Sequence, residues 1–202
     1  MTRLRICVLG CGAMARRHAR ALRALGTVDL LFASRERERA ETFRREFGGA
    51  GAFGAYEEAC ASPRVDAVLD CTPHALHLAN ARLAAAHGKH LLVEKPAARN
   101  LVELDAMIAA VDAAGVTAMV AENYFFKPVV RVFREVIASG DIGRPLLLEL
   151  NRTSRSTVRG WRADAAMMTR IVSFPRDSHR GRVRRSQISP GACGPTADSR
   201  GR

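Results

Sequence analysis

The sequence predicts an α/β protein with a doubly wound parallel sheet of the Rossmann type, followed by the start of an incomplete second α/β domain. Between residues 3 and 122, short apolar runs alternate with helical stretches, and glycines or prolines separate them. Parallel neighbours need a crossover, so this alternation predicts a parallel sheet, and right-handed crossovers make it doubly wound. The apolar runs are nearly continuous, which is typical of strands buried on both faces.

The elements of this sheet follow one another with short connections. The expected strands are Leu4–Leu9, Val28–Ala33, Ala52–Phe53, Ala67–Cys71, His90–Val93 and Thr117–Ala121. The expected helices are Met14–Leu25, Arg35–Phe47, Glu57–Ala61, Ala75–His87 and Leu101–Ala114. Four of these helices are followed by a glycine, the residue favoured for a left-handed cap: Gly26, Gly48, Gly88 and Gly115. On the last helix, four apolar residues share one face: Leu101, Leu104, Ile108 and Val111.

The pattern changes after Asn123. Pro128 is expected to begin a helix that Gly140 ends, and Pro145–Leu150 is a further strand candidate. The apolar face of that helix carries Val129, Val130, Phe133, Val136 and Ile137. We therefore assign residues 1–122 to the first domain and residues 123–165 to the beginning of the second. Residues 166–202 show neither helical nor strand periodicity, and we expect a disordered basic tail.

Composition and charge exclude several classes of protein. The net charge is +12, but residues 166–202 contribute +6 of it from eight arginines and two aspartates. In the rest of the chain, basic and acidic residues alternate on helices, which indicates solvated faces rather than a nucleic-acid surface. No apolar run approaches the roughly 18 residues of a membrane span. The five cysteines are scattered, without metal-ligand or disulfide spacing, which indicates reduced thiols in a cytoplasmic protein.

A glycine-rich turn directly follows the first expected strand. The segment Gly10–Ala15 reads G-x-G-x-x-A and opens the first helix, so Ala13 and Met14 belong to the same turn. Gly10 permits the tight turn, and Gly12 allows the backbone to approach a pyrophosphate. The helix N-terminus offers free N–H groups and a positive partial charge to the phosphates. This context predicts dinucleotide binding, whereas an isolated motif would indicate only a tight turn.

The end of the second strand bears on which dinucleotide is bound. An acid is expected there when the ligand is NAD, but Asp29 lies at the opposite end of the strand. Ser34 and Arg35 instead could hold a 2′-phosphate through a hydroxyl and a guanidinium group. The sequence therefore favours NADP. Because Glu36 follows and Arg35 could simply open a charged helix, NAD remains an alternative.

Two further strand ends carry polar groups. Cys71, Thr72 and Pro73 end the fourth strand, and His74 and His77 follow at a spacing that can ligate a metal. No third ligand is apparent, so we expect no metal site. The fifth strand ends in Glu94-Lys95-Pro96, at the sheet edge where Rossmann ligands bind. A lysine there can hydrogen-bond a substrate hydroxyl and assist the departure of its proton, although a structural ion pair is the alternative.

Together these motifs resemble the glucose–fructose oxidoreductase and inositol dehydrogenase family. The similarity rests on the order and spacing of Gly10–Ala15, Thr72-Pro73 with His77, the segment from Gly88 to Pro96, and Ala121–Tyr124. It extends through Ser139–Gly143 to Trp161–Asp164. The resemblance implies an NAD(P)-dependent oxidoreductase that oxidises a sugar or polyol hydroxyl, or reduces the corresponding carbonyl. It also implies a second domain with an open sheet for substrate binding and oligomerisation.

The resemblance further implies roles for individual residues. Lys95 would be the catalytic group that contacts the reacting hydroxyl, and Glu94 and His77 would line the nicotinamide pocket. Cys71, Thr72 and Pro73 would border the cofactor, and Asn123 with Tyr124 would lie near the pocket at the domain junction.

The chain departs from the family pattern after Asp164. The family continues with a glycine-rich segment and then an acid and a histidine on one helix, and residues 166–202 contain nothing similar. We therefore expect a truncated chain, with residues 166–202 read out of frame, that is inactive alone and would form a homo-oligomer only with a complete second domain. The alternative is a non-catalytic dinucleotide-binding or regulatory protein. The identity of the substrate stays open.

Overall fold

A computed structural model describes residues 3–144 and Leu146. The expected strand Pro145–Leu150, the Trp161–Asp164 segment and the tail 166–202 lie outside the described residues. Within the described part, none of the helices is long and apolar enough to cross a lipid bilayer.

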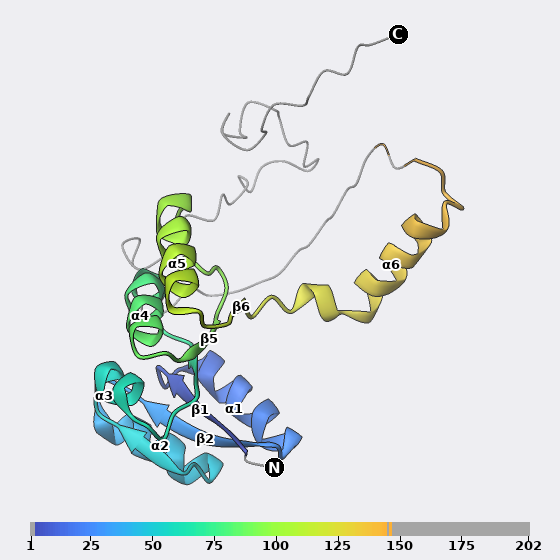
Figure 1. Ribbon diagram of the computed structural model, residues 1–202. Coiled ribbons are helices and arrows are strands. Elements are labelled where there is room, and N and C mark those ends of the chain that lie inside the picture. Colours follow the sequence, from blue (N-terminus) through green and yellow to red (C-terminus); the bar gives the residue numbers. More distant parts are fainter. Residues whose placement is uncertain (1–2, 145, 147–202) are drawn as a thin grey trace, which may run out of the picture. The chain divides into compact units, whose positions relative to one another are not determined.

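The centre of the fold is a six-stranded sheet in the order β3-β2-β1-β4-β5-β6 (Figure 1). Every recorded strand pair is parallel. The strands are β1 (Leu4–Leu9), β2 (Val28–Ala33), β3 (Gly51–Phe53), β4 (Ala67–Asp70), β5 (His90–Val93) and β6 (Ala118–Val120). This order reverses direction between β1 and β4, which is the switch point where Rossmann folds bind dinucleotides. The predicted doubly wound sheet is confirmed.

Helices connect the strands nearly as expected. They are α1 (Ala13–Leu25), α2 (Arg37–Phe47), α3 (Tyr56–Ala61), α4 (His74–Ala86) and α5 (Leu101–Ala114). Gly26, Gly48 and Gly115 cap three of them in the left-handed conformation, with φ between 63° and 67°. The fourth glycine, Gly88, also has a positive φ but follows one residue after the cap of α4. The sequence signal for helix ends is therefore confirmed.

Both faces of the sheet are covered by helices. On one face, aromatic rings of α2 pack on Phe32 of β2, with the centroids of Phe43 and Phe47 5.7 and 6.0 Å from its own. Ala15 and Ala19 of α1 join this cluster. On the other face, residues of α3, α4 and α5 pack against alternate residues of the same strands, including Cys7 and Leu9 of β1. This alternation explains why the strand sequences are apolar at almost every position.

The expected apolar face of α5 is only partly correct. Val111 is buried, but Leu101 and Ile108 are 70% and 49% exposed. Met107, which the sequence pattern did not single out, is buried in the core instead. Almost every residue of α5 is apolar or small, so the periodicity in the sequence did not define one unique face.

A short 3-10 turn, η1 (Tyr124–Phe126), and the helix α6 (Pro128–Ser139) follow the sheet. Pro128 occupies the first turn of α6 and Gly140 caps it with a φ of 77°, as expected from the sequence. The apolar side chains of this helix are not buried: Val129 is 70% and Phe133 45% exposed. The hydrophobic pattern therefore predicted the helix correctly, but its apolar face has no partner among the described residues.

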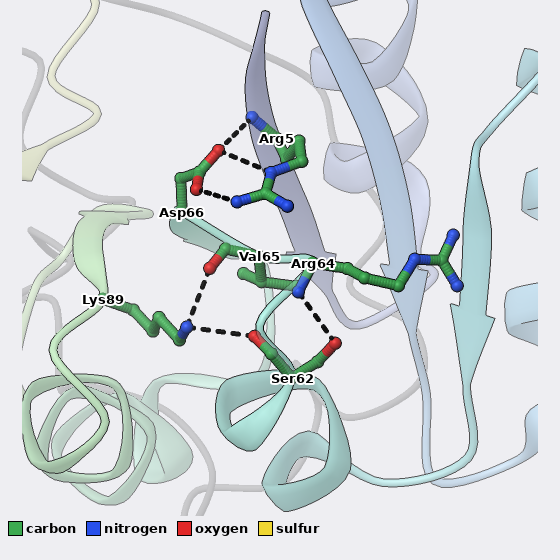
Figure 2. A network of polar contacts seen from close by, with 6 residues as sticks. All are labelled: Arg5, Ser62, Arg64, Val65, Asp66 and Lys89. Carbon is green, nitrogen blue, oxygen red and sulfur yellow. Dashed lines mark hydrogen bonds and ion pairs between the residues drawn. The ribbon is translucent and has the colours of Figure 1, made fainter. Parts of the chain in front are cut away.

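The amino-terminal edge of the sheet is held by a polar network (Figure 2). The Arg5 guanidinium group binds both carboxylate oxygens of Asp66, and the backbone N–H of Arg5 donates to the same carboxylate at 2.8 Å. Lys89 donates to the carbonyl oxygens of Ser62 and Val65 at 3.0 and 2.8 Å. These contacts fix the loop between α3 and β4 against the starts of β1 and β5. They lie at the edge opposite the candidate site.

Candidate functional site

The loops that follow the strands meet at the carboxyl edge of the sheet, because parallel strands all end on one side. Backbone hydrogen bonds extend the sheet into these loops. Gly10 donates to Ala33 at 2.9 Å, and Cys71 donates to Leu9 at 2.9 Å. Glu94 donates to Asp70 at 2.9 Å, and Ala121 donates to Val93 at 2.8 Å. The sheet thus gathers the predicted site residues of five loops along one edge, and the loops have little freedom to move apart.

The two glycines of the first loop have different surroundings. Gly10 has a φ of 84°, and a Cβ there would lie 3.2 Å from Thr72 and 3.3 Å from the backbone of Cys71. A Cβ on Gly12 would meet nothing within 4 Å. Gly12 is also the N-cap of α1, and no side chain caps this helix. The first N–H groups of α1 therefore border open space, as a phosphate site requires.

Ala13 and Met14 form the first turn of α1 behind this space. Ala13 is exposed and Met14 is half-buried. Ala15 is fully buried, which confirms that a small residue allows α1 to pack closely on the sheet.

The end of β2 presents an arginine to solvent. Ser34 is buried, and its hydroxyl accepts a hydrogen bond from the N–H of Glu36 at 3.2 Å. The hydroxyl hydrogen of Ser34 can still be donated. Arg35 is exposed and close to the Tyr56 hydroxyl. Burial raises the pKa of Tyr56, and the nearby Arg35 partly opposes that rise. Glu36 is paired with Arg39 at 2.7 Å.

A buried polar network makes the loop after β4 rigid. The Asp70 side chain is fully buried, and its carboxylate accepts from the N–H of Thr72 at 2.9 Å and from the Asn80 amide at 3.0 Å. The same Asn80 amide donates to the Thr72 hydroxyl at 3.0 Å. The described residues have no buried side-chain nitrogen or oxygen without a partner. The Thr72-Pro73 turn is therefore fixed before any ligand binds.

His77 joins this loop to the loop after β5. Its ring is fully buried on α4, with Nε2 3.0 Å from the carbonyl oxygen of Thr72. Its Nδ1 lies 3.0 and 3.2 Å from the carbonyl oxygens of Pro96 and Ala97. Both nitrogens thus face backbone carbonyls, and the described residues contain no cluster of three metal-ligating side chains. This geometry favours a positioning role, while the expected contact of His77 with a nicotinamide stays a prediction.

The loop after β5 places a buried carboxylate beside an exposed lysine. Glu94 is 8% exposed, and Lys95 is exposed at the same edge of the sheet. One oxygen of Glu94 lies 2.6 Å from Nε2 of His18, on α1. The other accepts the backbone N–H of Lys95 at 3.0 Å. Burial raises the pKa of Glu94, but these two hydrogen bonds outweigh burial, so its pKa is lowered and the group is ionised.

The sequence analysis did not identify His18. The pairing joins residues 76 positions apart, so local spacing carries no signal for it. Asn123 is exposed just beyond β6, at the same edge, and its part in cofactor binding stays a prediction.

The thiols near the site are not activated. Burial raises the pKa of Cys11 to about 11, and it raises the pKa of Cys71 still further. The four cysteines of the described part are all unpaired. Since only the thiolate is a good nucleophile, these side chains act as small packing groups around the glycine-rich loop.

Comparison with known proteins identifies the family. Residues 4–122 match the model of an oxidoreductase family described as having an NAD-binding Rossmann fold. The chain belongs to this family. The matched region includes all six strands and every predicted site residue except Asn123 and Tyr124.

Named dehydrogenases and a solved structure are similar to part of this chain. A scyllo-inositol 2-dehydrogenase (NADP(+)) from Bacillus subtilis is 44% identical over 95 residues, which are 47% of this chain and 29% of that protein. The mouse trans-1,2-dihydrobenzene-1,2-diol dehydrogenase is 37% identical over 111 residues, 55% of this chain and 33% of that protein. The crystal structure of an NAD binding oxidoreductase from Klebsiella pneumoniae aligns with a TM-score of 0.67 and 35% identity. That alignment covers 72% of this chain and 41% of the Klebsiella chain, so the chain spans well under half the length of these relatives.

Proposed function

We propose that the carboxyl edge of this sheet binds a nicotinamide dinucleotide, with its pyrophosphate at the N-terminus of α1. The observation that carries the proposal is the open space at Gly12, which any side chain would enter, beside the uncapped N–H groups of α1. A dianionic pyrophosphate is attracted by the partial positive charge of those groups and can reach them only where no Cβ intervenes.

We propose NADP as the preferred cofactor and NAD as the alternative. Arg35 is exposed at the end of β2, where its guanidinium group can pair with a 2′-phosphate, and the Ser34 hydroxyl can donate beside it. Glu36 is paired with Arg39, so its negative charge is partly neutralised and repels a 2′-phosphate less strongly. The inositol dehydrogenase from Bacillus subtilis, 44% identical over the matched segment, carries NADP(+) in its name.

We further propose that the reaction is an oxidation of a sugar or polyol hydroxyl, or the reverse reduction. The nicotinamide ring supplies the chemistry of accepting or donating a hydride. Lys95, which is exposed after β5, can donate a hydrogen bond to the substrate oxygen and assist the departure of its proton. The two named relatives are dehydrogenases of an inositol and of a dihydrodiol, both of which carry neighbouring hydroxyl groups. The unpaired cysteines support a cytoplasmic, reducing location.

The test combines cofactor binding with turnover. NADPH fluorescence is titrated with the full chain, and the chain is then assayed with NADP and NAD against a panel of polyols and sugars. Saturable binding with turnover supports the whole proposal, whereas binding without turnover favours a non-catalytic dinucleotide-binding or regulatory protein. Absence of binding by both cofactors would overturn the site itself.

Substitution of Lys95 separates its role in chemistry from binding. We expect Lys95→Ala to leave the affinity for NADPH nearly unchanged, because its exposed side chain does not support the fold. In a version of the enzyme with a complete second domain, turnover should fall by about 10²–10⁴-fold, the usual contribution of a group that assists proton transfer. A Lys95→Ala variant that turns over at the original rate would show that Lys95 has no role in the reaction.

A further inference from the structure

The turn that carries Lys95 is held from two sides. On one side, His77 of α4 lies 3.0 and 3.2 Å from the carbonyl oxygens of Pro96 and Ala97, which directly follow Lys95. On the other side, the Glu94 carboxylate accepts the backbone N–H of Lys95 at 3.0 Å. The backbone at Lys95 and directly after it is therefore held by the side chains of Glu94 and His77.

The Glu94 carboxylate depends on a partner from another element. Its side chain is only 10% exposed, and a buried carboxylate is stable only when charged or polar donors replace water. His18 supplies that donor: its Nε2 is 2.6 Å from Oε1 of Glu94, and a carboxylate can only accept the hydrogen. Without His18, one oxygen of Glu94 would lose its recorded side-chain donor, and the contact to Lys95 would weaken.

His18 lies in α1, one turn beyond the residues that open this helix. It is four residues after Met14, so the two side chains share one face of the helix. The side chain of His18 is 25% exposed, which is less than expected for a histidine on the solvent-facing side of a helix. The helix whose N-terminus would hold the pyrophosphate is thus tied directly to the turn that would act on the substrate.

We propose that His18 is a positioning residue, which acts through Glu94 to fix the backbone of Lys95 in the orientation needed to bind the substrate oxygen and assist the departure of its proton. The proposal rests on the proposed function for the role of His18 in catalysis. The effect of the His18–Glu94 contact on the Lys95 backbone can be measured without cofactor or substrate. It adds to the site a residue of α1 that lies beyond the first turn of the helix.

The test follows hydrogen exchange of the Lys95 backbone amide by NMR in the full chain. In His18→Leu, this amide should exchange about tenfold faster, because its acceptor is no longer held. His18→Gln should restore slow exchange, since its amide nitrogen can donate to Glu94 from nearly the same position. The matched control is His87→Leu, which removes an exposed histidine at the end of α4 and should leave the Lys95 amide unchanged. Amides of β1 and β4 report the stability of the sheet in every variant.

Unchanged exchange at Lys95 in His18→Leu, or an equal increase in His87→Leu, overturns the proposal. Failure of His18→Gln to slow the exchange also overturns it. If His18→Leu does not fold, Glu94→Gln provides the same test, because it keeps the shape of the side chain and removes the negative charge that His18 and the Lys95 N–H both contact. Faster exchange is again the supporting result, and unchanged exchange the contrary one.

Kinetics distinguish a failure of this proposal from a failure of the proposed function. Where the chain turns over a polyol, His18→Leu should lower kcat at least about tenfold and leave KM for NADPH unchanged, and His18→Gln should recover most of kcat. Equal loss of kcat and of NADPH affinity would show a general structural defect and count against positioning. Absence of turnover by this chain alone agrees with the expected truncation, and the exchange experiment then supports or overturns the positioning role of His18.

Discussion

Gly10 and Gly12 lie two residues apart but are required for different reasons. At Gly10 the backbone is left-handed, and a Cβ would press on Thr72 and Cys71, so the fold itself needs a glycine there. At Gly12 the φ is −108°, an ordinary value for any residue, and a Cβ would meet nothing. A glycine is therefore needed at position 12 only if a ligand fills the space. This contrast is the most direct indication of function in the molecule.

The preference for NADP depends on Arg35. We expect Arg35→Ala to weaken NADPH binding by about 1.5–3 kcal/mol, the range for a hydrogen bond to a charged group, because the guanidinium partner of the 2′-phosphate is lost. NADH binding should change little, since NADH has no such phosphate. Fluorescence titration of both cofactors measures the two effects, with Arg37→Ala on the same exposed helix start as the control. Equal affinities for NADPH and NADH, both unaffected by Arg35→Ala, would contradict the assignment.

The ion pair of Arg5 and Asp66 links stability to pH. Hydrogen bonds from Arg5 lower the pKa of Asp66 from 3.8 to about 2. A lowered folded-state pKa adds stability above the unfolded value, and this contribution is lost as the pH falls from about 4 towards 2. Because both side chains are partly exposed, solvent screening limits the contribution to about 1 kcal/mol. Asp66→Asn should therefore lower the free energy of unfolding by about that amount at pH 7.

Urea unfolding between pH 7 and pH 3 measures this effect. The difference between the original chain and Asp66→Asn should be constant down to about pH 4 and then shrink. Asp105→Asn, which changes an exposed carboxylate on α5, serves as the control. A difference that keeps the same size at pH 3 would show that Asp66 acts by packing and not by its charge.

At this scale, local spacing predicted some site residues and missed others. Gly12 and Lys95 were predicted as site residues because each lies within three residues of the end of a predicted strand, and strand ends converge at one edge of a parallel sheet. His18 was missed because its contact with Glu94 depends on how α1 lies across the sheet. The contacts of His77 with the carbonyl oxygens of Pro96 and Ala97 were also not predictable, since these residues follow β5, 19 and 20 positions further along the chain.

Among the elements, strands and helix ends were predicted more accurately than helix faces. Val28–Ala33 and Leu4–Leu9 have the predicted bounds, because a buried parallel strand leaves a continuous apolar run in the sequence. The helices end where the predicted glycines adopt a left-handed conformation. The buried face of α5 was predicted incorrectly at two positions, because a helix that is apolar nearly all round gives no clear periodic signal.

Two neighbouring residues of α5 test which face is buried. Met107 is 4% exposed and lies in the core, whereas Ile108 is 49% exposed. We expect Met107→Ala to lower the free energy of unfolding by about 2–5 kcal/mol, through lost burial and the cavity it leaves. Ile108→Ala should change it by less than about 0.5 kcal/mol. Urea denaturation of both variants measures the difference, and a larger loss for Ile108→Ala would restore the face that the sequence pattern suggested.

Across the whole molecule, burial decreases from the centre of the sheet towards β6. Val8, Leu69, Leu92 and Met119 pair in one row across β1, β4, β5 and β6. Val8 and Leu69 are buried, but Met119 is 59% exposed. In the described part of the chain, the hydrophobic core on this face of the sheet is formed mainly by residues of α1 and α2 that pack on β1 and β2. The proposed dinucleotide site is at the carboxyl ends of β1 and β4, on the well-packed side, so we expect cofactor binding not to require the exposed edge.

Cofactor binding should therefore stabilise the entire fold. A ligand that binds only the folded state adds about 2.7 kcal/mol at one hundred times its dissociation constant. For a domain of this size, that corresponds to a rise in Tm of roughly 5–15 °C. Differential scanning fluorimetry with increasing NADPH measures the rise, and Lys95→Ala should show it in full because the lysine is not needed for binding.

Gly12→Ser makes this prediction specific to the proposed site. The side-chain oxygen of a serine at the N-cap of α1 can accept a hydrogen bond from one of the first N–H groups of the helix, so the Tm without cofactor should be unchanged or slightly higher. The same side chain enters the space that the pyrophosphate would occupy, so the NADPH-induced rise should be lost. If Gly12→Ser keeps the full rise, the dinucleotide binds elsewhere. If its Tm falls sharply without cofactor, then Gly12 is required by the fold, and the open space at this position is not evidence for a ligand.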